Sequence, residues 1–113
     1  MSGIYLTLGG KERTLRFSFL SLKALEQHYG KPIGKVFADN LKEGEMMLSD
    51  ITTFLWACLR KEKLSVAKIE ELIDESIENE ELTIEELAQA IQKAVAESKV
   101  AKAQTKGDEE GKN

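Results

Sequence analysis

Residues 15–37 read LRFSFLSLKALEQHYGKPIGKVF, and the spacing of the apolar residues changes within this stretch. Up to Phe19 they alternate, which is typical of a strand with one buried face. From Leu22 onward they recur at steps of three and four, the spacing of one face of a helix. The stretch therefore predicts a strand followed by a helix that begins near Ser18 or Ser21, because either hydroxyl can cap free backbone N–H groups.

The second half of the stretch, HYGKPIGK, contains the one histidine and the one proline of the chain. Gly30 is expected to end the first helix, and Pro32 prevents the helix from continuing. A phosphate-binding loop would need four residues between its glycines and a Ser or Thr after its lysine. Here three residues intervene and Val36 follows Lys35, so the pattern predicts a junction between two helices.

Upstream of this stretch, residues 4–8 (IYLTL) also alternate, and the Gly-Gly pair at 9–10 favours a tight reversal. The reversal and the return strand at 13–17 together predict an N-terminal β-hairpin. A hairpin alone is marginal in water, so we expect helices to cover its apolar face. On the return strand, Leu15 and Phe17 are predicted to point inward, and Arg13 and Arg16 are predicted to lie off that face.

Downstream, capping residues and helical spacing predict further helices at about 33–41 and after Ser49, Ser65 and Thr83. The predicted fold is mainly α, with about five short helices packed with the N-terminal hairpin. The predicted inward residues of the last three helices are Ile51, Phe54, Leu55, Cys58 and Leu59; Val66, Ile69, Ile73 and Ile77; and Ile84, Leu87, Ala88, Ile91 and Val95.

Length and composition favour one domain. The chain has 113 residues, of which 42% are hydrophobic, enough for a modest core. We expect this domain at 1–98 and a flexible tail or linker at 99–113, where few residues could be buried. Apolar runs are too short to span a bilayer, and the N-terminus has no export signal pattern. A single cysteine is typical of a reducing cytoplasm.

The charge is distributed unevenly along the chain. Residues 69–98 contain ten acidic side chains and one lysine, so this segment would repel nucleic-acid phosphates. Basic residues elsewhere are mixed with acids and lack the interleaved aromatic residues that stack on bases. We therefore expect no nucleic-acid partner. The acidic run from Glu70 to Glu86 is typical of a solvated helix side, although it could instead dock a basic partner.

Residues capable of chemistry do not form a recognisable site in the sequence. His28 lies off the apolar stripe of its helix and has no predicted co-ligands for zinc. Cys58 lies on an unbroken apolar stripe, where cysteine usually acts as a small hydrophobe. The segment 39–50 resembles a calcium loop, but its third position is Leu41, which offers no side-chain oxygen. We predict no catalytic, cofactor or metal site and no enzymatic activity; a small enzyme dependent on Cys58 is the weakest alternative.

A protein-binding surface is the remaining hypothesis. Trp56 lies off the centre of its helix's apolar stripe, where an indole either closes the core or contacts a partner. Met46 and Met47 precede the same helix and could add an adaptable apolar contact. We therefore predict Met46, Met47 and Trp56 as partner-binding residues.

The order of these features resembles a known family. A hairpin of the form LTLGGKERTLRFSF leads into LKALEQHYGKPIGKVF, then into helices like ITTFLWACLRKE and SVAKIEELIDE, and finally into a Thr-capped helix. Across about residues 3–97 this order is similar to that of the tail assembly chaperones of long-tailed phages and prophages.

The resemblance implies a function and partners. Such a chaperone would bind the tape measure protein, keep it soluble and help recruit tail tube subunits. It would contact the tail tube protein through a longer, frameshifted form, for which 99–113 would be the linker. It would act in the cytoplasm of the bacterial host and be absent from the mature virion. Self-association stays open, and the alternative is a small cytoplasmic helical adaptor or regulator unrelated to phages.

Overall fold

The computed structural model describes residues 4–98, and within them the chain is mainly helical, as predicted. The predicted tail or linker at 99–113 lies outside the described residues. One antiparallel hairpin precedes five α-helices and a short 3-10 turn. The elements are β1 Ile4–Leu8, β2 Lys11–Leu15, α1 Phe19–Tyr29, α2 Ile33–Asn40, α3 Leu48–Cys58, η1 Arg60–Glu62, α4 Val66–Glu78 and α5 Ile84–Glu97.

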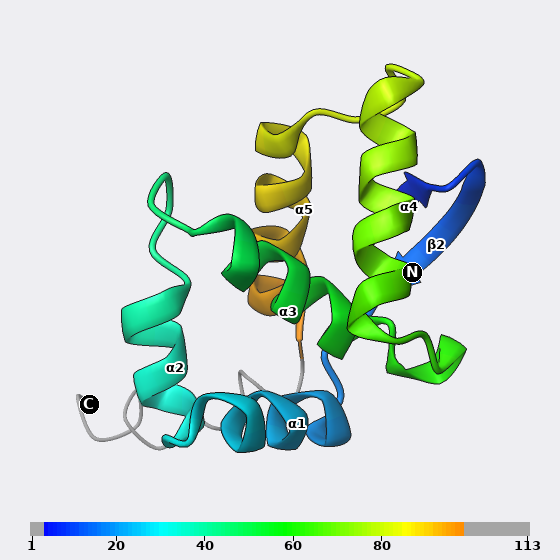
Figure 1. Cartoon of the computed structure of the whole chain (residues 1–113). Helices are drawn as coiled ribbons and strands as arrows, with labels where there is room; N and C mark the ends of the chain where they lie inside the picture. The colour runs from blue at the N-terminus through cyan, green and yellow to red at the C-terminus, as the bar shows by residue number, and fades with distance from the viewer. Residues whose placement is uncertain (1–3, 99–113) are drawn as a thin grey trace.

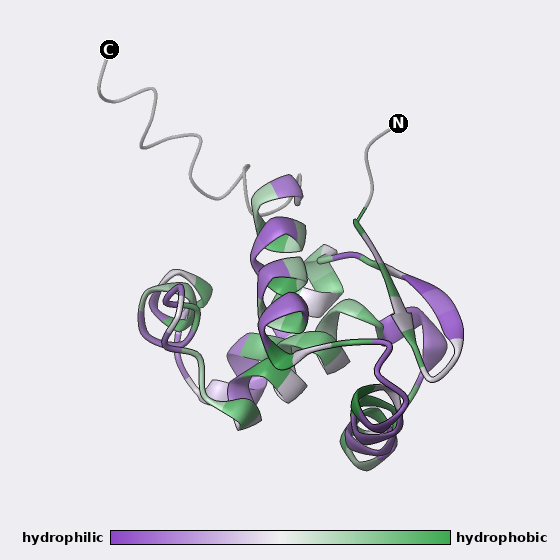
Figure 2. Cartoon of the chain, turned by 90° about the horizontal axis from the view of Figure 1, so that it is seen from above, coloured by the Kyte–Doolittle hydropathy of each residue, from purple (hydrophilic) through white to green (hydrophobic). Residues whose placement is uncertain are grey.

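Helix α3 lies at the centre of the molecule, between α1 and α2 on one side and α4 and α5 on the other (Figure 1). Its side chains Phe54 and Leu55 are fully buried. The residues predicted to point inward from this helix are all buried, so the core prediction for α3 is confirmed. In Figure 2, hydrophobic and hydrophilic segments alternate along the ribbons of α4 and α5, which are amphipathic helices around this core.

The junction between the hairpin and the helices forms at the predicted place. The side chain of Ser18 caps α1 by accepting a hydrogen bond from the backbone N–H of Ser21 at 3.2 Å. Gly30 ends the helix with a left-handed φ of 69°. Pro32 then precedes α2, and the Glu26 carboxylate accepts a hydrogen bond from the N–H of Ile33 at 2.8 Å. These contacts fix the turn between α1 and α2.

The hairpin docks on α4 through its Gly-Gly turn. Gly9 and Gly10 have φ values of 64° and 76°, a region that favours glycine. The N–H of Gly9 donates a hydrogen bond to Oγ of the fully buried Ser76 at 2.7 Å. A Cβ atom at Gly9 would collide with the side chain of Leu72. The close approach of the turn to α4 therefore requires glycine at position 9.

The prediction for Arg13 was wrong. The register pairs Arg13 with Leu6, on the same side of the hairpin as Leu15, because residues two apart in a strand share a face. The guanidinium Nε donates a hydrogen bond to the carbonyl of Leu8 at 2.9 Å, and the same group forms an ion pair with Glu62. The arginine stays on the inner side because both partners compensate its burial.

The predicted inner faces of α4 and α5 need a similar correction. On α4 the buried residues are Ile69, Leu72 and Ser76, whereas Ile73 and Ile77 are half-buried. The reason is that α4 must cover the hairpin turn as well as α3, so its inner side is rotated towards Leu72. On α5, Leu87 and Ile91 are buried as predicted, but Ile84 is 46% exposed.

Candidate functional site

The three predicted partner-binding residues do not form one surface. Met47 is 68% exposed at the start of α3. Met46 is half-buried, and its sulfur lies 3.7 Å from the side-chain nitrogen of Gln92 on α5. Trp56 is half-buried near the other end of α3, with its ring centroid 6.5 Å from that of His28. The structure thus separates Trp56 from the methionines, and partner binding by these residues stays a prediction.

A groove of about 640 Å³ opens between the start of α3, where Leu48 follows Met47 in the chain, the length of α4 and the start of α5. Leu48 is 63% exposed at one edge and Ile84 is 46% exposed at another. The half-buried side chains of Ile73 and Ile77 line it from α4. Apolar side chains from three helices therefore converge on a surface that is open to solvent.

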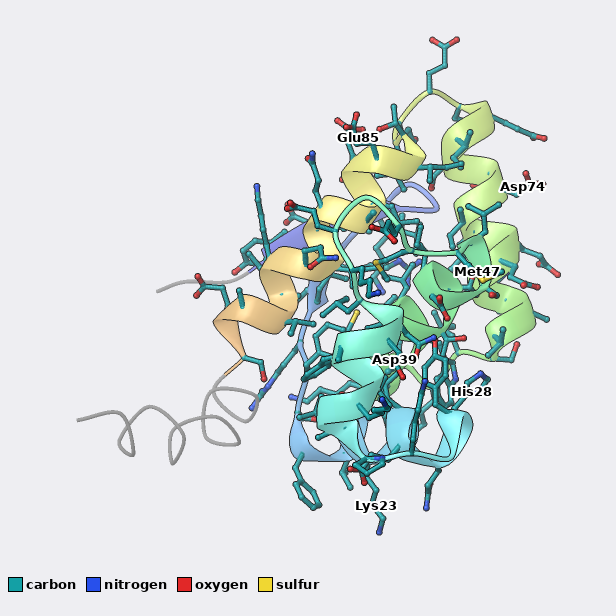
Figure 3. The ribbon with its side chains drawn as sticks, turned by 90° about the vertical axis from the view of Figure 1, so that its left-hand side faces the viewer. Lys23, His28, Asp39, Met47, Asp74 and Glu85 are labelled. Carbon is teal, nitrogen blue, oxygen red and sulfur yellow. The ribbon has the colours of Figure 1, made fainter. Side chains whose placement is uncertain are left out.

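The rim of this groove is acidic. Glu70, Glu71 and Asp74 of α4 all line it and are exposed. Lys68 lies 3.8 Å from a carboxylate oxygen of Glu71, whereas no ion pair within residues 4–98 involves Glu70 or Asp74. Met47 and Asp74 lie on the same side of the molecule in Figure 3. An apolar groove with uncompensated carboxylates at its rim suits a partner that is apolar and positively charged.

Sequence reasoning missed this groove for an identifiable reason. Ile73, Ile77 and Ile84 fit the apolar spacing of their helices and were therefore predicted to lie in the core. The apolar stripe of α4 is broad, since Leu72 also belongs to it, and a helix of this kind has more apolar surface than one neighbour can cover. The breadth of that stripe was the signal in the sequence for an open side.

The residues considered for chemistry lie apart from the groove. Burial raises the pKa of the Cys58 thiol far above its usual range, so the thiol is protonated at neutral pH and donates a hydrogen bond to the carbonyl of Leu55 at 3.3 Å. His28 is exposed on α1 and contacts the rings of Tyr29 and Trp56. Cys58 is therefore a core residue in a form that is a poor nucleophile.

The carboxylate at the end of the calcium-like segment has a structural role. Asp50 is buried and accepts hydrogen bonds from the Tyr29 hydroxyl at 2.7 Å and from Nδ2 of Asn40 at 3.3 Å. Burial and this contact with Asp50 raise the pKa of Tyr29. In the part of the chain that the structure describes, no His, Cys, Asp or Glu side chains are grouped so that they could hold a metal ion. Among residues 4–98, no helix has the length and apolar composition needed to cross a bilayer.

Comparison with known protein families shows a match over most of the chain. A family model described as "Phage tail tube protein, GTA-gp10" matches residues 2–99. No curated protein and no solved structure matches the chain.

This match confirms the relation to phage tails but overturns the predicted function. The matching family is one of tail tube proteins, so the prediction of a tail assembly chaperone was wrong, and a tape measure partner has no support. The alternative of an adaptor unrelated to phages was also wrong. The resemblance was carried by the order of apolar residues and turns, which specify a fold, and a fold does not by itself specify a function.

Proposed function

The chain belongs to the phage tail tube protein family GTA-gp10, and we propose on this premise that it is a structural subunit of a phage tail tube. The observation that carries the proposal is the extent of the match. Residues 2–99 include the hairpin and every helix of the described region, so the similarity covers the fold and not a fragment of it.

The surface of the molecule supports an assembling role. A tube is built by repetition, so each subunit must offer its neighbours surfaces that remain open in the isolated chain. The groove between α3, α4 and α5 is such a surface, because Leu48 and Ile84 remain exposed at its edges. We also propose that the chain is not an enzyme and acts through protein contacts alone; its one thiol is buried and protonated.

Quantitative mass spectrometry of purified particles tests the proposal. Tails would be isolated from a lysate that contains the chain and washed at high salt to remove loosely bound proteins. A tube subunit should persist through the wash in many copies per tail. If the protein is abundant in the lysate and absent from washed tails, it is not a structural subunit.

The same measurement decides the predicted localisation. Confinement to the cytoplasm of the bacterial host, with absence from the mature virion, stays a prediction that followed from the chaperone resemblance. A tube subunit is made in that cytoplasm but must leave with the particle. Antibody labelling along the length of tails in electron micrographs would give an independent reading of the same question.

A further inference from the structure

We propose that the groove binds the first turn of α1 of a second copy of this chain, so that copies associate head to tail. This inference rests on the proposed function and names the partner of the groove. We call Phe19, Leu20 and Lys23 the α1 knob. The occupant of the groove is thus an exposed apolar turn with an adjacent lysine, presented by a neighbouring subunit.

The α1 knob is an unusually exposed apolar surface. Phe19 is 67% exposed and Leu20 is 60% exposed. They point outward because α1 turns its other side to the core, where Leu22 and Leu25 are buried. Lys23 follows Phe19 by four residues and Leu20 by three, so the three side chains share one side of the helix.

The chemistry of the knob complements that of the groove. The apolar side chains of the knob match the lining by Leu48, Ile73 and Ile84. No ion pair described for residues 4–98 involves Lys23, so its ammonium is available to the carboxylates of Glu70 and Asp74. A groove facing a second groove would instead bring the carboxylates of two copies together, which is unfavourable.

The positions of the two surfaces determine the kind of assembly. In Figure 3, Lys23 lies at the opposite end of the molecule from Asp74 and Glu85. A knob therefore cannot reach the groove of its own chain. Contacts between unlike surfaces at opposite ends leave one knob and one groove free after each addition, so association continues as an open polymer or closes into a ring.

A single contact of this kind is expected to be weak. The knob contributes two large apolar side chains and one charge, and the contact must offset the loss of translational and rotational freedom. Association should therefore be detectable only at high protein concentration and should weaken as salt screens the Lys23 charge. In a tube, many such contacts would act together and bind far more tightly.

Sedimentation velocity with complementary variants tests the proposal. The knob variant carries Phe19→Ser and Leu20→Ser, and the groove variant carries Leu48→Lys and Ile84→Lys. All four positions are exposed, so both variants should fold, as circular dichroism would verify. The wild-type chain should show a mass that rises with concentration across the range from 10 µM to 1 mM by order of magnitude, and each variant alone should stay monomeric.

Mixing the two variants gives the decisive result. The knob variant keeps an intact groove, and the groove variant keeps an intact knob. The mixture should therefore form a one-to-one dimer and nothing larger. A wild-type chain that is monomeric throughout, or a mixture that forms no dimer, would overturn the proposal. Unimpaired association of the knob variant alone would overturn it as well, since it would show that the groove pairs by another route.

A charge reversal adds a second readout. Lys23→Glu should weaken wild-type association several-fold, and Asp74→Lys in the same chain should restore much of it. Lys93→Glu is the matched control, because Lys93 is an exposed lysine of α5 that lines neither surface. Equal weakening by Lys23→Glu and Lys93→Glu would indicate an effect of net charge only and would count against the proposed pairing.

The two proposals fail in different ways. If the chain is absent from washed tails, the assignment as a tube subunit fails whatever the sedimentation data show. If it is present in tails but the complementary variants do not dimerise, the assignment stands and the head-to-tail pairing is wrong.

Discussion

Helix α4 has apolar side chains on two adjacent sides, and the two sides differ in what covers them. On one side, Leu72 and Ser76 are buried against the hairpin turn, with the Gly9 N–H bonded to the serine hydroxyl at 2.7 Å. On the other side, Ile73 and Ile77 line a groove that nothing within residues 4–98 fills. The first side is covered within one chain, whereas the second is open to solvent and would be covered by the second copy of the chain proposed above. Neighbouring isoleucines and leucines of one helix can thus serve stability and assembly separately.

The largest expected difference is between two adjacent residues of α4. Leu72→Ala removes a buried side chain and should lower the free energy of unfolding by about 3–4 kcal/mol. Ile73→Ala truncates a half-buried side chain at the groove and should cost about 1 kcal/mol, because little cavity is created. Urea denaturation of the two variants measures both values. Similar losses for the two would contradict the distinction between a closed and an open side.

The next largest loss of stability is expected at the hairpin turn, which covers the side of α4 that contains Leu72 and Ser76. Gly9→Ala introduces a Cβ at a positive φ and against Leu72, which should cost about 2–3 kcal/mol. Gly10→Ala is the matched control, since its φ is also positive but a Cβ there has no neighbour within 4 Å. That control should lose about 1 kcal/mol by the same denaturation assay. Equal losses would mean that the turn does not press on α4.

Removing the hydrogen bond at the same contact should have a smaller effect. Ser76→Ala leaves the Gly9 N–H without its acceptor, at a cost of about 1–2 kcal/mol in the free energy of unfolding. Ser49→Ala is the control: α3 begins at Leu48 with no side-chain cap, so Ser49 is not the predicted cap, and the exposed residue should change the free energy of unfolding by no more than about 0.5 kcal/mol. Hydrogen exchange would localise the effect, because the Gly9 amide should lose protection in the first variant and keep it in the second.

The sequence predicted the helix ends and the inward side of α3 well, because each of these features depends on residues close together in the chain. Thr83 caps α5 through its hydroxyl and Gly30 ends α1 in a left-handed conformation, both as predicted, and of the two predicted caps of α1, Ser18 and Ser21, the structure uses Ser18. The inward stripe of α3 was also unambiguous, since every residue predicted to point inward from it is buried. Features of this kind can therefore be recognised from a single sequence.

The groove could not be predicted in the same way, because it depends on which neighbour covers which side of α4. Spacing showed that Ile73 and Leu72 are both apolar, but the contact of Gly9 with Ser76 decides which one is buried, and these residues are 67 positions apart. The predicted site residues show the same limit. Leu48, which follows Met47 in the chain, lines the groove, whereas Trp56 lies elsewhere, near His28.

The smallest expected effect on stability is at the edge of the groove formed by α5. Ile84→Lys replaces a side chain that is 46% exposed at the first turn of α5, and the free energy of unfolding should change by no more than about 0.5 kcal/mol. The Thr83–Glu86 capping box next to it holds the helix start without help from Ile84. The same variant should nevertheless weaken the concentration-dependent rise in mass seen by sedimentation. A loss of stability as large as that of Leu72→Ala would mean that Ile84 belongs to the core of the single chain, and the distinction between the two sides of the α4 surface would no longer hold.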